Sequence, residues 1–205
     1  MPSFNGWQII SIPATPAPAS IGFTDVDTVG ISKSPFTGQV QVYDWQASWL
    51  EASITMPPMN NATARAWVAF MRALHGRSNV FQLGDPINAT PQGSGSGVPV
   101  VNGASQTGYA LQTRGWTAGA AGVLMPGDWI QIGYRLYSNL GQVNADGSGD
   151  AILNIWPQLR ESPADGAQLI LNNTQGLWRL KSNSRKSSLS VVKTWGFQFD
   201  IEEAI

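Results

Sequence analysis

Alternation of apolar and polar residues predicts β-strands along much of this chain. Residues 39–45, "QVQVYDW", alternate strictly, which is the period of a strand. The two faces of this strand carry Val40, Val42 and Asp44 on one side and Gln41, Tyr43 and Trp45 on the other. Residues 34–38, "SPFTG", read as a turn before the strand. Residues 48–56, "SWLEASITM", are expected to be its hairpin partner, and residues 22–30, "GFTDVDTVG", predict a further short strand.

A helix is predicted where the apolar spacing lengthens from two residues to three or four. The apolar positions at i, i+3, i+4 and i+7 are Trp67, Phe70, Met71 and Leu74. They form a single stripe, which we expect to be buried against a sheet. Asn60 or Asn61 suits the N-cap, and Gly76 suits the left-handed C′ position after the last turn. The pattern therefore predicts a helix over residues 61–75.

The remainder of the chain is predicted to be β after one loop-rich segment. Residues 84–108 are rich in Gly, Pro, Ser and Asn and nearly uncharged. The strands expected after them include "DWIQIG", "YRLYSNLGQV", "AILNIWP", "AQLIL", "GLWRLKS" and "SVVKTWGFQFDI". The Asp-Gly step in "NADGSGD", residues 144–150, favours a turn between two of these strands.

These elements predict a mainly β fold made of two nested parts. Residues 1–87 and 176–205 are expected to form a β-sandwich that includes the single α-helix. Residues 88–175 are expected to form a small β-barrel inserted into it. One sandwich with a long meander is the alternative arrangement.

Composition points to a subunit that meets other protein. Only 12% of the 205 residues are charged, and nine are Trp. Low surface charge is a hazard for a free monomer and is tolerable in an assembly. The net charge of -1 provides no field that draws the chain to nucleic acid or to an acidic membrane. No apolar run is long enough to cross a bilayer, so no membrane insertion is expected. The N-terminus lacks the basic start and apolar core of a signal peptide.

No pattern in the sequence indicates an enzyme. His75 is the single histidine and is placed in the last turn of the predicted helix, where a cation suits the helix dipole. A Ser-His-Asp triad would have to use this residue. Asp25 and Asp27 form a possible carboxylate pair, and residues 144–150 resemble the start of a calcium loop whose bidentate Glu is missing. We expect no catalytic residues, no cofactor and no metal.

Tryptophans and basic residues are the candidate contact residues. Trp45, Trp49 and Trp67 are expected to serve in packing or at an interface, although a Trp count this high also permits a carbohydrate-binding module. A basic cluster near the C-terminus is made of Arg179, Lys181, Arg185, Lys186 and Lys193. It is either a solvated strand face or a contact to another subunit or to a channel.

An ordered series of motifs resembles the distal tail proteins (Dit-like proteins) of tailed bacteriophages. The series runs through "SPFTGQVQ", "TMPPM", "ARAWVAFMRALHG", "FQLGDP", "LMPGDWIQIG", "ILNIWPQLR", "ADG", "GLWRL" and "FQFDIEEA". It covers most of residues 34–205. The resemblance implies a β-sandwich with a helix and an inserted OB-like barrel. It also implies a ring, usually hexameric, and the family has no catalytic residues to carry over.

The expected function is therefore that of a structural virion protein. The resemblance implies a homo-hexameric ring at the tail tip, or baseplate, that joins the tail tube protein to the tail hub protein. The tape-measure protein and, in transit, DNA would pass through its channel. Assembly would take place in the cytoplasm of the bacterial host. We expect the ring interface to use edge strands near residues 38–56 and 177–200. The alternative is a carbohydrate-binding module on a tail or cell surface.

Overall fold

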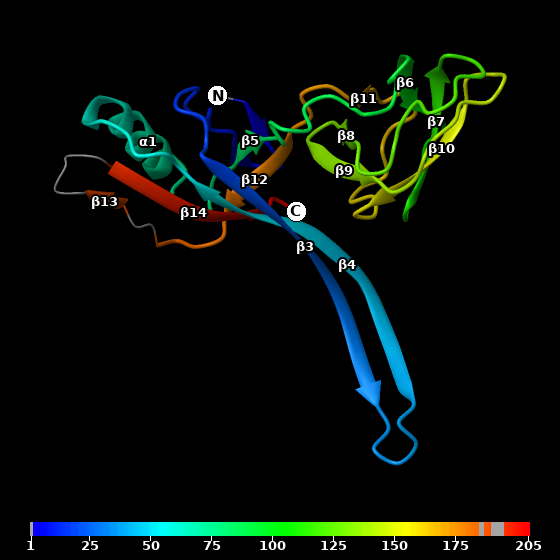
Figure 1. The fold of residues 1–205 in the computed structure, drawn as a ribbon, viewed down its shortest axis with the longest axis horizontal. Coiled ribbons are helices and arrows are strands. Elements are labelled where there is room, and N and C mark those ends of the chain that lie inside the picture. Colours follow the sequence, from blue (N-terminus) through cyan, green and yellow to red (C-terminus); the bar gives the residue numbers. More distant parts are fainter. Residues whose placement is uncertain (1, 185–186, 190–194) are drawn as a thin grey trace. The chain divides into compact units, whose positions relative to one another are not determined.

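A computed structural model describes residues 2–184, 187–189 and 195–205 of the protein. The fold is mainly β with one helix, and its sheets are sandwich-like in one part and nearly closed into a barrel in another, which confirms the predicted fold class (Figure 1). The chain divides into two compact units. The first comprises residues 1–82 and 178–204, and the second comprises residues 83–177 with Ile205. The sequence-based boundaries, after residue 87 and before residue 176, lie close to this division.

The first unit is built on one sheet. Its strands, in spatial order, are β3 (Ser20–Lys33), β4 (Val40–Thr55), β14 (Trp195–Glu203), β12 (Gly176–Leu180) and β5 (Phe81–Leu83). Of these strands, β3, β4, β14 and β12 pair antiparallel in that order. The short strand β13 (Ser187–Leu189) pairs with β14. Near the N-terminus, β1 (Ser3–Phe4) pairs with β2 (Trp7–Gln8). The strand β3 is thus one edge of the sheet.

The hairpin predicted between residues 39–45 and 48–56 is wrong. Both segments belong to the single 16-residue strand β4, and the partner of β4 is the 14-residue strand β3. The local break that reads as a turn is an irregularity at Gln46, which has a φ of 56°. The pairing register shifts there, between Asp27 and Val29 of β3. A bulge of this kind lets a strand continue past residues that do not fit the ladder.

The predicted helix is confirmed, although α1 (Asn61–Ala73) is slightly shorter than expected. The Asn60 side chain caps it by accepting a hydrogen bond from the Thr63 N–H at 3.0 Å. The apolar stripe is buried against the core as predicted: Trp67, Phe70, Met71 and Leu74 are each at most 7% exposed. The Trp67 and Phe70 rings meet edge to face at 5.7 Å.

The helix ends differently from the prediction. Leu74 is the C-cap, so the left-handed C′ position belongs to His75 (φ 47°), and Gly76 (φ 69°) follows it. His75 is exposed and lies beyond the last helical turn. The Asn79 side-chain amide donates to the Ala73 carbonyl at 2.8 Å and satisfies one of the free helix carbonyls.

The second unit is a nearly closed barrel-like sheet. In spatial order its strands are β11 (Leu169–Ile170), β8 (Trp129–Ile132), β9 (Arg135–Asn139), β10 (Ala151–Trp156), β7 (Ala110–Trp116) and β6 (Gly97–Val101). Backbone hydrogen bonds of 2.8 and 3.0 Å join Val101 to Ala167 and Gly166, which brings the two ends of the sheet together. A single core cluster that includes Leu111, Ile130 and Leu153 fills the interior.

The loop-rich segment is held by a buried carboxylate. Asp128, just before β8, is 4% exposed and accepts hydrogen bonds from the Gln92, Gly93 and Met125 N–H groups at 2.7, 3.1 and 2.7 Å. A buried charge is tolerated when its oxygens are satisfied in this way. The segment is therefore fixed to the barrel although it has little regular structure.

Candidate assembly interface: the β3–β4 arm

The first unit carries a two-stranded arm, which we define as residues 28–46. The strand β14 pairs with β4 only over residues 51–55, so β3 and β4 continue past the rest of their sheet as a ribbon (Figure 1). All of residues 39–47 are exposed. An isolated two-stranded ribbon is at best marginally stable in water. An arm of this length is therefore a candidate contact surface.

The tip of the arm is a compact turn at the predicted "SPFTG" segment. The Ser34 N–H donates to the Gln39 carbonyl at 2.9 Å, and the Gly38 N–H donates to the Ser34 carbonyl at 3.0 Å. The Ser34 hydroxyl accepts from the N–H groups of Phe36 and Thr37. Gly38 supplies the positive φ of 71° that the turn requires. This places Phe36 at the tip with 95% of its surface exposed.

One face of the arm is aliphatic. Paired residues share a face, and the pairs on this face are Val29 with Asp44, Ile31 with Val42, and Lys33 with Val40. All four aliphatic side chains are exposed, from 45% for Val29 to 71% for Ile31. Val40 and Val42 were predicted from the sequence to share a strand face, but the matching positions of β3 were not predicted. The signal was the alternation of Val29 and Ile31 with Gly30 and Ser32.

The opposite face is aromatic and polar. It carries Gly30 paired with Tyr43 and Ser32 paired with Gln41. The Tyr43 hydroxyl donates to the Gln41 side-chain carbonyl at 2.8 Å. Trp45 also lies on this face, with its ring against the Gly30 backbone. The aliphatic face is therefore less compatible with exposure to water than this aromatic and polar face.

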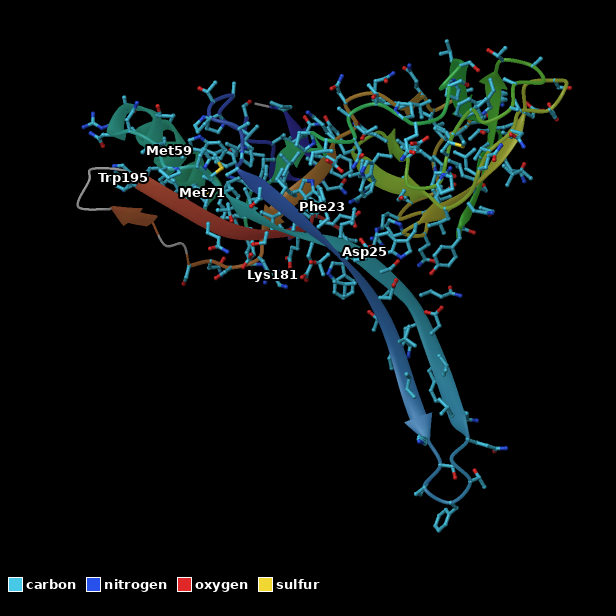
Figure 2. All side chains as sticks on the ribbon, in the orientation of Figure 1. Phe23, Asp25, Met59, Met71, Lys181 and Trp195 are labelled. Atoms are coloured by element: carbon cyan, nitrogen blue, oxygen red, sulfur yellow. The ribbon has the colours of Figure 1, made fainter. Side chains whose placement is uncertain are left out.

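Two carboxylates mark the root of the arm. Asp25 pairs with the buried Leu50, and Asp27 pairs with the buried Ser48. Figure 2 shows Phe23 and Asp25 on β3 where the strand leaves the sheet. Partial burial, and then the neighbouring charge of Asp27, raise the pKa of Asp25 above its ordinary value.

The three candidate tryptophans lie in three different environments. Trp67 is in the core, 1% exposed, with its indole N–H donating to the Thr15 carbonyl at 3.2 Å. Trp49 is half-buried and donates to Glu51 at 3.3 Å. Trp45 is 64% exposed on the arm. All nine tryptophans are among the described residues, and the other eight are buried or half-buried.

The described part of the basic cluster makes contacts within its own unit. The Arg179 guanidinium lies 4.3 Å from the centre of the Trp7 ring. The Lys181 ammonium donates to Glu51 at 2.5 Å. This hydrogen bond raises the pKa of Lys181 and lowers the pKa of Glu51. Arg185, Lys186 and Lys193 lie outside the described residues.

Within the predicted interface segment of residues 177–200, the strands β12 and β14 each have a neighbouring strand on both sides. The strand β12 lies between β14 and β5, and β14 lies between β4 and β12. The unpaired backbone edges in the described part of this sheet include the outer side of β3 and the outer side of β4 within the arm. The predicted interface segment around residues 38–56 contains the second of these edges.

The possible calcium loop of residues 144–150 lies in the second unit, away from the arm in sequence. Residues 144–150 form a turn in which the Asp146 carboxylate accepts from the N–H groups of Ser148 and Asp150 at 2.8 and 2.9 Å. A depression of about 470 Å³ beside this turn is lined by polar residues such as Asn102, Gln112 and Asp150, and no aromatic residue lines it. Among the described residues, no group of three or more acidic or histidine side chains is placed to hold a metal ion. The helix of the described chain is too short and too polar to cross a bilayer.

Comparison with protein-family models and with curated proteins finds no match for this chain.

Proposed function

We propose that this protein is a structural subunit of a phage tail tip, a distal tail protein that forms a homo-hexameric ring between the tail tube and the tail hub. The single observation that carries the proposal is the arm, which presents contiguous apolar side chains and free backbone edges to solvent. Such a surface promotes aggregation of a monomer, and in an assembly it can be buried at a specific contact. The ordered motifs of residues 34–205 supply the tail assignment.

Low charge density supports an assembly in which a large surface loses water. Charged residues make up 12% of the chain, and within the arm they are Lys33 and Asp44. Covering the arm therefore buries few charged side chains. This matters because burying an unpaired charge is costly. A ring of this kind leaves an axial channel for the tape-measure protein and for DNA.

A carbohydrate-binding module is less well supported. Sugar sites commonly use the faces of exposed aromatic rings, and eight of the nine Trp are buried or half-buried. The exception, Trp45, already covers Gly30. We also propose that the chain has no hydrolytic activity. Turnover of cell-wall glycan that is lost on changing a single carboxylate would contradict this.

The test of the proposed function is a reconstruction of the intact particle. We expect six copies around the tail axis, between tube and hub. Finding the chain only as an appendage away from that axis would contradict the proposal. In a complementation assay, Ile31→Asp on the arm should abolish infectious particles. Ile152→Asp is the matched control, because Ile152 is similarly exposed on a strand of the second unit (65% against 71%).

A further inference from the structure

We propose that the arms of adjacent copies pair edge to edge, with β3 of one arm beside β4 of the next. This inference rests on the proposed ring and names the partner of the arm as a second copy of the same chain. It specifies which strands meet and which face of the arm becomes buried.

Among the described residues of the first unit, the exposed large hydrophobic side chains all lie in the arm. The exposed large hydrophobic residues described in this unit are Val29, Ile31, Phe36, Val40, Val42, Tyr43 and Trp45. Those of the second unit are scattered over loops and separate strands: Ile87, Val98, Tyr109, Leu140, Ile152, Ile170 and Ile205. Scattered apolar residues are ordinary, whereas a contiguous set marks a contact surface. If the partner is a second copy of this chain, the surface of that copy that best complements the aliphatic arm is therefore its own arm.

The free edges dictate which strands can meet. The outer edge of β3 and the arm part of β4 run in opposite directions. When neighbouring arms point the same way, as cyclic symmetry requires, β3 of one copy is antiparallel to β4 of the next. This contact joins two different edges, so it repeats head to tail, which is the kind of contact that a cyclic ring requires. Pairing β3 with β3 would instead be two-fold symmetric and would end at two copies.

The charges of the arm do not oppose this pairing. On the aliphatic face, Lys33 lies near the tip, level with Val40, and Asp44 lies near the root, level with Val29. When neighbouring arms are aligned, like charges are therefore not placed directly opposite each other, which would be unfavourable. The aliphatic face then becomes a continuous surface around the ring.

Cysteine pairing tests this directly, because the chain contains no cysteine. Ser32→Cys is made in one chain, on β3, and Gln41→Cys in a second, differently tagged chain, on β4. Both residues are exposed and lie on the polar face, so the aliphatic face is unchanged. Gln39→Cys, directly before β4 and two residues from Gln41, provides a second position in case the register shifts by two residues. The mixed full-length proteins are oxidised, and covalent dimers are measured.

The expected result is a disulfide between Ser32→Cys and a β4 cysteine of another copy. Adjacent strands lie about 4.8 Å apart, within reach of a disulfide. Two β3 strands separated by an intervening β4 are roughly 10 Å apart, beyond that reach. Ser32→Cys alone should therefore give no covalent dimer. Ser32→Cys mixed with Ser78→Cys, an exposed position on the turn after α1, should give none either.

Each other outcome overturns the inference or separates it from the proposed function. Dimers of Ser32→Cys with itself would mean that β3 pairs with β3. A ring that forms without the β3–β4 disulfide would overturn the inference and leave the proposed function standing. A disulfide to an unrelated tail protein in place of a second copy would also overturn it. If the disulfide forms but the chain is absent from the tail tip, the proposed function fails and the arm pairing stands.

Discussion

The indole of Trp45 lies directly over Gly30 on the neighbouring strand of the arm. A Cβ atom at residue 30 would come within 2.6 Å of the Trp45 Cη2 atom, closer than real contacts of this kind. An aromatic ring that covers a strand glycine shields the backbone and fixes the twist of the two strands. Gly30 is therefore required by the ring above it.

Gly30→Ala should displace the Trp45 indole and loosen the arm. The global free energy of unfolding should change by no more than about 0.5 kcal/mol, since the site is outside the core. Trp45 emission should shift to the red, and amide hydrogen exchange should accelerate over residues 28–46. Gly22→Ala is the control, because Gly22 is also on β3 and has nothing within 4 Å of its Cβ position. Unchanged exchange in Gly30→Ala would contradict the argument.

Two tryptophans on the first unit should differ widely in their effect on stability. Trp67→Ala removes a ring that is 1% exposed and packs against Phe70 and Phe199, and it should cost about 3–5 kcal/mol. Trp45→Ala removes a ring that is 64% exposed and should cost far less. Chemical denaturation of the two variants measures the difference. Equal losses would mean that Trp67 is not a core residue.

Sequence predicted the parts of this fold that depend on local signals. The helix stripe, its Asn60 cap and the Ser34 turn each lie within about a dozen residues, so their chemistry is readable in order along the chain. The single strand β4 was missed because Gln46 breaks the local alternation. The ladder with β3 that carries the strand across this break is visible only in the pairing.

The candidate site was predicted in part for the same reason. Tyr43, Trp45 and the valines of β4 were recognised as strand residues, but whether a strand face is buried depends on what covers it. The arm extends beyond β14, so the whole of its β4 segment is exposed. Nothing in the alternation itself distinguishes such a segment from a core strand. The contacts of Arg179 and Lys181 could not be predicted, because their partners Trp7 and Glu51 are distant from them in sequence.

The carboxylate of Asp128 should stabilise the second unit through the loop it holds. Asp128→Ala leaves the Gln92, Gly93 and Met125 N–H groups without their acceptor. Each of these hydrogen bonds to the carboxylate contributes on the order of 1 kcal/mol, so the melting temperature should fall clearly. Asp150→Ala is the control: Asp150 is a half-buried carboxylate of the same unit, and the change should have a small effect. If both variants melt alike, the carboxylate does not hold the loop.

Asp25 and Glu51 should shift stability in opposite directions with pH. The fold raises the pKa of Asp25 through burial and through Asp27, so the ionised form opposes folding at neutral pH. Asp25→Asn should therefore melt at a higher temperature than the wild type at pH 7. This advantage should shrink as the pH falls through the raised folded pKa, and it should vanish below the ordinary value of 3.8.

The contribution of Glu51 to stability depends on pH with the opposite sign, because the hydrogen bond from Lys181 lowers the pKa of Glu51. Its contribution is present above the ordinary value of 4.5 and is lost as the pH falls through the lowered folded pKa. Glu51→Gln should melt below the wild type at pH 7, and the two curves should converge in acid. Both variants are compared by thermal unfolding from pH 7 to pH 3 at low protein concentration, so that association does not contribute. An Asp25→Asn variant that melts at or below the melting temperature of the wild type at pH 7 would show that the ionised Asp25 carboxylate does not destabilise the folded state.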